Sequence, residues 1–133
     1  MIAADFARFT ALASERLTRP ALPLPGATPA ELERLAAGLG RPVPAELVEL
    51  LRACGGHQVG PGGVGPLNFR RVLSAEEILQ EHAMLNAAVG DRSEPEPQPA
   101  YYRHRVWSPA WIPFMAFQND TYVLDLDLDP GEW

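Results

Sequence analysis

The sequence contains no lysine, so all eleven of its basic side chains are arginines. This absence excludes Schiff-base, phosphate-loop and protein-kinase lysines as functional groups. Cys54 is the single cysteine, which excludes an intramolecular disulfide and favours a reducing compartment. No basic segment followed by an apolar core opens the chain, and no apolar run reaches membrane-spanning length. We therefore expect a soluble, cytoplasmic protein without a membrane partner.

Acidic side chains are concentrated in the C-terminal third of the chain. Residues 91–133 contain 8 acidic and 3 basic side chains, whereas residues 1–90 contain 9 and 8. The formal net charge of the whole chain is −6. Because a nucleic-acid binder needs a basic patch for phosphate groups, we expect no direct binding of nucleic acid.

Four segments have the apolar spacing of amphipathic helices, namely residues 4–18, 28–40, 44–54 and 74–89. Two of them open with a capping box, Thr28-Pro29-Ala30-Glu31 and Ser74-Ala75-Glu76-Glu77. The Pro-rich stretch 19–27 predicts a linker. We therefore divide the chain into an N-terminal helix with its linker, residues 1–27, and a single domain, residues 28–133.

The region around residues 111–129 has the pattern of a β-hairpin. An apolar run, Trp111 to Phe117, is followed by Gln118-Asn119-Asp120, where Asn and Asp favour a tight turn. The chain then alternates strictly, which is typical of a strand with two different faces. The face expected to be buried carries Tyr122, Leu124, Leu126 and Leu128, and the other carries Thr121, Val123, Asp125, Asp127 and Asp129. The predicted fold is α+β, with N-terminal helices packed on a mainly antiparallel β-sheet.

Two glycine-containing motifs have a chemical interpretation that the surrounding sequence does not support. Residues 60–65 match G-x-G-x-x-G, but they follow a predicted helix instead of a strand, and Pro66 comes next. Cys54-Gly55-Gly56-His57 has the spacing of half a zinc site, but the other histidines have no cysteine near them. We expect Cys54 to be a small core residue and His57 a loop residue.

No segment predicts catalysis or a bound cofactor. No serine lies in a G-x-S-x-G motif, and no histidine has a recognisable acid or base partner. The row Asp125, Asp127 and Asp129 resembles the start of a calcium loop, but Pro130 stands where that loop needs glycine. We therefore expect no catalytic residues, no cofactor and no metal ion.

The acidic row leaves two interpretations open. It forms either a solvated face of the sheet or a surface for a partner, in which Asp125, Asp127 and Asp129 are joined by Glu132. The aromatic residues Trp107 and Trp111 are most simply part of the core, although tryptophan is also enriched among the residues that anchor interfaces. We therefore take the four acids and the two tryptophans as the candidate partner-binding residues.

The order of these motifs resembles the SMI1/KNR4 family, also called the SUKH superfamily. The resemblance rests on the helix opening at Val43-Pro44-Ala45-Glu46-Leu47, on Gly55-Gly56, on Leu73-Ser74-Ala75-Glu76-Glu77-Ile78, and on Trp111-Ile112-Pro113-Phe114 leading to Leu124-Asp125-Leu126-Asp127. It covers roughly residues 28–133. Members of the family usually have a Gly-rich turn where this chain has Gln118-Asn119-Asp120. They also usually continue with a further strand and a final helix, whereas the sequence here stops at Trp133.

The resemblance implies a non-enzymatic protein-binding module. Bacterial members of the superfamily are mostly immunity proteins, which neutralise toxins, often nucleases, by binding them. A basic toxin domain is therefore the expected partner. The competing interpretations are a regulatory scaffold, as in the family's fungal cell-wall regulators, and a metal-dependent hydrolase that uses Asp125, Asp127 and Asp129. An unpaired sheet edge next to the acidic strand also predicts either a longer native protein or a homodimer.

Overall fold

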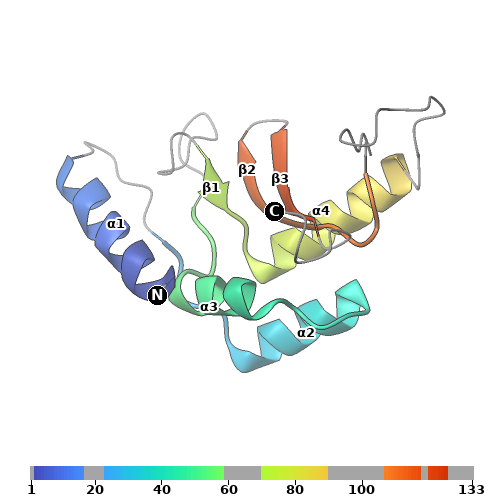
Figure 1. The fold of residues 1–133 in the computed structure, drawn as a ribbon, viewed down its shortest axis with the longest axis horizontal. Helices are drawn as coiled ribbons and strands as arrows, with labels where there is room; N and C mark the ends of the chain where they lie inside the picture. Colours follow the sequence, from blue (N-terminus) through green and yellow to red (C-terminus); the bar gives the residue numbers. More distant parts are fainter. Residues whose placement is uncertain (1, 17–22, 59–69, 90–106, 118–119, 126–133) are drawn as a thin grey trace, which may run out of the picture.

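The computed structural model describes residues 2–16, 23–58, 70–89, 107–117 and 120–125. These residues form four helices and three strands, and this arrangement confirms the predicted α+β fold (Figure 1). In chain order the elements are α1 (Ile2–Arg16), α2 (Pro29–Leu39), α3 (Ala45–Ala53), β1 (Arg71–Val72), α4 (Ala75–Ala88), β2 (Ile112–Phe117) and β3 (Asp120–Leu124).

Both predicted capping boxes are present, and they set the first residues of α2 and α4. The hydroxyl of Thr28 accepts a hydrogen bond from the Glu31 amide, and the Glu31 carboxylate accepts one from the Thr28 amide. Ser74 and Glu77 form the same pair of bonds at the start of α4. Each box satisfies backbone donors that have no partner within the helix, so local sequence alone fixes where these helices begin.

The three strands form an antiparallel sheet in the order β1-β2-β3. The predicted hairpin is confirmed, because β2 pairs with β3 from Phe117 opposite Asp120 to Ile112 opposite Leu124. The register shifts between Pro113 and Met115, which is the signature of a β-bulge in β2. The described part of the first strand is short, with Arg71 opposite Ala116 and Val72 opposite Met115 of β2.

The strict alternation predicted for β3 is wrong over its described part. Leu124 packs against the core as expected, but Thr121, which was predicted to lie on the opposite face, contacts α4. The side chains from Thr121 to Leu124 are all half-buried. Neighbouring residues of β3 therefore both have contacts, since Thr121 bonds Glu81 of α4 and the Tyr122 ring stacks with the Arg70 guanidinium.

The core lies between the sheet, α4 and the helix pair α2–α3. Figure 1 shows α2 and α3 below the sheet, with α4 running beneath β2 and β3. The most deeply buried large side chains come from all of these layers: Leu35, Leu51, Ile78, Ile112 and Val72. The core thus joins elements far apart in the sequence and holds α4 and the hairpin in a fixed relation.

Helix α1 packs beside α3, at the opposite end of the molecule from the C-terminal part of α4 (Figure 1). Its inward side chains Phe6 and Phe9 are half-buried, as the predicted apolar stripe requires. The Phe6 ring lies 5.7 Å from the His57 ring, measured between centroids. One aromatic contact therefore links this helix to the segment that follows α3.

Candidate protein-binding face

A groove runs between α4 and the sheet, with a volume of about 490 Å³. Helix α4 supplies one wall, and one residue from each of the three strands supplies part of the other. The lining residues are Arg71, Leu73, Glu77, Gln80, Glu81, Met84, Ala116 and Thr121. The groove therefore combines charged, polar and apolar groups, and the packing of α4 on the hairpin fixes its shape.

The two glutamates in this groove have different surroundings. Glu77 is fully engaged: Oε1 accepts a hydrogen bond from the Arg71 guanidinium at 2.8 Å, and Oε2 accepts one from the Ser74 amide at 2.8 Å. Glu81 accepts a hydrogen bond at Oε1 from the Thr121 hydroxyl, at 2.6 Å. Glu77 thus serves the start of α4, whereas Glu81 links the middle of α4 to β3.

Met84 gives the groove an exposed apolar wall. Its side chain is 51% exposed, and Leu12 on α1 is the other large apolar side chain that is exposed within the described residues. Single exposed apolar residues are common, but methionine is flexible and polarisable and is used often at binding surfaces. Its position in a groove with two carboxylates makes this groove a candidate for contact with a partner.

Asp125 is the one member of the predicted acidic row that lies within the described residues. It directly follows β3 and is half-buried. Asp127, Asp129 and Glu132 lie outside the described residues. The described acidic residues on and directly after β3 are therefore Asp120 and Asp125, and the row as a whole stays a prediction.

The two candidate tryptophans lie in different environments. Trp107 is 2% exposed, and its indole N–H donates a hydrogen bond to Asn86 on α4 at 2.7 Å. Its ring packs edge-on against Trp111 and against His82. The side chain of Trp107 is therefore a core residue that joins the segment before β2 to α4, and it is not accessible as a partner anchor. Trp111 is half-buried.

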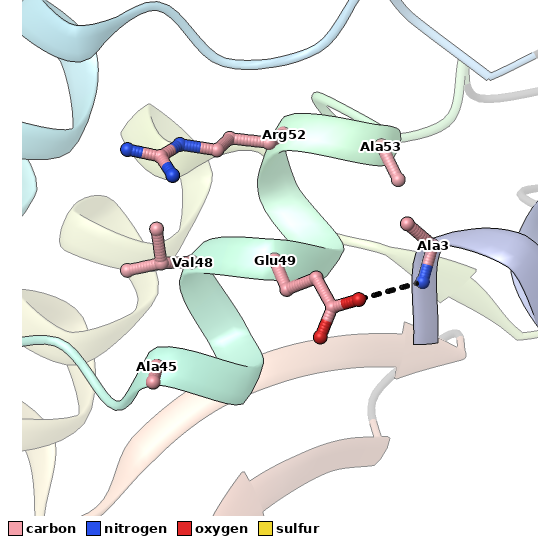
Figure 2. Close-up of a pocket in the computed structure, with 6 residues that line it drawn as sticks. All are labelled: Ala3, Ala45, Val48, Glu49, Arg52 and Ala53. Atoms are coloured by element: carbon pink, nitrogen blue, oxygen red, sulfur yellow. Dashed lines mark hydrogen bonds between the residues drawn. The ribbon is translucent and has the colours of Figure 1, made fainter. Parts of the chain in front are cut away.

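A second hollow, of about 610 Å³, lies between α1 and α3. It is lined by Ala3, Ala45, Val48, Glu49, Arg52 and Ala53. Figure 2 shows the Glu49 carboxylate turned toward Ala3 and the Arg52 side chain pointing away from it. The Ala3 amide donates to Glu49 Oε1 at 3.3 Å, and this bond is the main cause of the lowered pKa of Glu49. Glu49 therefore caps the first turn of α1 from a neighbouring helix.

The environment of His57 differs from the predicted loop position. His57 is 2% exposed, and its Nδ1 accepts a hydrogen bond from the Val72 amide at 3.0 Å. Burial, and secondarily the charge of Arg71, lower the pKa of His57 to about 4. The neutral ring therefore joins the segment after α3 to β1. The sequence gives little sign of this role, since it depends on how β1 and α1 pack around the ring.

Cys54 is a buried core residue, as predicted. Its thiol donates to the Gly56 carbonyl at 3.1 Å, and its Sγ lies 4.0 Å from His57 Nε2. Burial raises the pKa of the Cys54 thiol, so the neutral form is favoured. In the part of the chain that the structure describes, no three His, Cys, Asp or Glu side chains are grouped to hold a metal ion.

Comparison with known proteins identifies the family. The family model described as SMI1 / KNR4 family (SUKH-1) matches residues 26–133. No curated protein matches the sequence significantly. The helices within the described residues are all too short or too polar to cross a membrane. The matched region begins just before α2 and contains every described element except α1. The chain therefore belongs to the SMI1/KNR4 family, SUKH-1.

Proposed function

We propose that the protein is a non-enzymatic binding module that acts in the cytoplasm as an immunity protein, neutralising a nuclease-type toxin by binding it. The observation that supports this proposal most strongly is the family match over residues 26–133. Bacterial members of the SUKH superfamily are mostly immunity proteins. The fold suits such a role, because its core fixes a helix and a hairpin side by side as a rigid surface.

Electrostatics support a basic partner. A nuclease toxin carries a basic surface for phosphate groups, and the C-terminal third of this chain, residues 91–133, has a net charge of −5 from 8 acids and 3 arginines. Opposite charges accelerate association and orient the two proteins as they meet. An acidic surface would also compete with nucleic acid for the toxin's basic site. We place Asp125, Asp127 and Asp129 at the centre of this surface, as the sequence predicts.

The test is to replace these three aspartates together by asparagine, which keeps the approximate size of each side chain. Stopped-flow binding to the cognate toxin is then measured at two salt concentrations. The triple variant is expected to associate more slowly and with a weaker dependence on salt. Single replacements are expected to have small effects, since an exposed charge pair contributes only about 0–1 kcal/mol. Unchanged association rates and salt slopes in the folded triple variant would show that the acidic row does not bind the partner.

The homodimer is a separate proposal. Within the described residues β3 pairs with β2 alone, and an open strand edge invites pairing with another chain. A monomer mass measured by light scattering at high protein concentration would exclude the homodimer.

A further inference from the structure

We propose that the groove between α4 and the sheet is a socket for one arginine or lysine side chain of the partner protein, with Glu81 as its anchoring carboxylate. This inference rests on the proposed function for the identity of the partner, a basic protein. It names a part of the surface that lies on α4 and differs from the predicted aspartate row.

Glu81 is the carboxylate in the groove that has capacity left for a partner. Its Oε1 accepts the Thr121 hydroxyl at 2.6 Å, and Oε2 has no hydrogen bond among the described residues. Glu77, in contrast, uses both oxygens, one for Arg71 and one for the Ser74 amide. A cation that enters the groove can therefore bind Glu81 Oε2 without breaking a hydrogen bond that the fold uses.

Thr121 positions this acceptor. Its bond to Glu81 joins β3 to α4 and restricts the rotation of the carboxylate before any partner arrives. Ordering a flexible glutamate at the moment of binding would cost entropy, so a carboxylate that is already held binds more tightly than a free one. Hydrogen bonds between two charged groups are also stronger than neutral ones, which favours a guanidinium or ammonium group at this position.

The rest of the lining fits the stem of a long basic side chain. Met84 is 51% exposed on α4, and Ala116 lies on β2, so the groove has apolar surface on both of its walls. Arginine and lysine bury their methylene groups along apolar surface while the charged head reaches a polar partner. A phosphate group would meet two glutamates and one arginine that is already paired with Glu77. The lining therefore favours a basic side chain over an anion.

The socket can be tested without the toxin, with the peptide acetyl-Gly-Arg-Gly-amide as the probe and its citrulline analogue as the neutral control. Binding is followed by the NMR signal of the Met84 methyl group. The arginine peptide is expected to shift this signal saturably, and Glu81→Gln is expected to weaken the binding at least about tenfold. Glu76→Gln is the matched control, because it removes the same charge from an exposed position of α4 outside the groove, where the Glu76 carboxylate accepts a hydrogen bond from Gln80.

Thr121→Val keeps the carboxylate but removes its positioning bond, so it is expected to weaken peptide binding by less than Glu81→Gln does. Three results would refute the proposed socket. They are the absence of a saturable shift in the natural protein, an equal shift with the citrulline peptide, and equal peptide binding by the Glu81 and Glu76 variants. A circular dichroism melt establishes that each variant is folded, and the Thr121 variant provides a second readout if Glu81→Gln does not fold.

The cognate toxin then separates this inference from the proposed function. If the natural protein binds the toxin, Glu81→Gln is expected to raise the Kd at least about tenfold and Glu76→Gln less than about twofold. Toxin binding with equal Kd values for the two variants would overturn the socket alone. A natural protein that fails to bind the toxin but binds the arginine peptide would overturn the proposed function and leave the socket standing.

Discussion

His57 makes the stability of this protein depend on pH in a predictable direction. Its Nδ1 accepts the Val72 amide at 3.0 Å, so the ring must be neutral and carry its proton on Nε2. A second proton at Nδ1 would place two N–H groups against each other in a buried site. This geometry agrees with the lowering of the pKa of His57 from 6.5 to about 4. Acid must therefore destabilise the native state through this residue.

The sign and size of the effect follow from proton linkage. Above pH 6.5 the ring is neutral in both the native and the unfolded chain, and no stability is lost. As the pH falls from 6.5 toward about 4, the unfolded chain binds a proton that the native protein does not, so stability falls. The lowered pKa corresponds to a total loss of about 3 kcal/mol, of which about 2.5 kcal/mol is lost between about pH 7 and about pH 4.5.

The assay is urea unfolding at a series of pH values, for the natural protein and for His57→Asn. Asparagine offers an amide oxygen to the Val72 amide and does not titrate, although its smaller side chain lowers stability at every pH. Both proteins contain the same carboxylates, so the contribution of these groups to the pH dependence of stability cancels when the two pH slopes are compared. The free energy of unfolding of the natural protein is expected to fall by about 2.5 kcal/mol more than that of the variant over this range. Parallel pH profiles would refute a buried, neutral His57.

Three further substitutions test the packing of the fold. Glu49→Ala removes the acceptor for the Ala3 amide, so hydrogen exchange should become faster across α1 and stay unchanged in α4. Gly26→Ala places a methyl group against the Arg52 carbonyl oxygen, and a loss of about 1–3 kcal/mol is expected in urea unfolding; an unchanged midpoint would contradict that contact. Ser74→Ala removes the cap of α4 and should cost about 1 kcal/mol in the same assay, whereas a neutral effect would show that the capping box is dispensable.

The parts of the fold that could be predicted from the sequence are those set by local chemistry. The boxes at Thr28 and Ser74 fix the first turns of α2 and α4 through bonds that span three residues. The antiparallel pairing of β2 with β3 was likewise predicted from the change from an apolar run to Gln118-Asn119-Asp120. These features need no knowledge of the rest of the molecule, and the structure confirms them.

The candidate groove could not be predicted, because it depends on contacts between distant segments. Thr121 meets Glu81 because the hairpin packs on α4, and no local sequence pattern encodes that packing. Trp107 was interpreted most simply as a core residue and alternatively as a partner anchor, and its burial and its bond to Asn86 agree with the first interpretation. His57 was predicted to be a loop residue. Its burial could not be foreseen, because Val72 and Phe6, which contact the ring, come from distant parts of the chain.

The central claim is that this protein neutralises a toxin by binding it, and a titration of toxin activity tests it most directly. A nuclease toxin found in a neighbouring reading frame is purified, and its activity is measured as the protein is added in increasing amounts. The account predicts that activity falls to the background level as the two proteins approach equal concentration, and that added salt weakens the inhibition. Full toxin activity in the presence of a large excess of the folded protein would contradict the account.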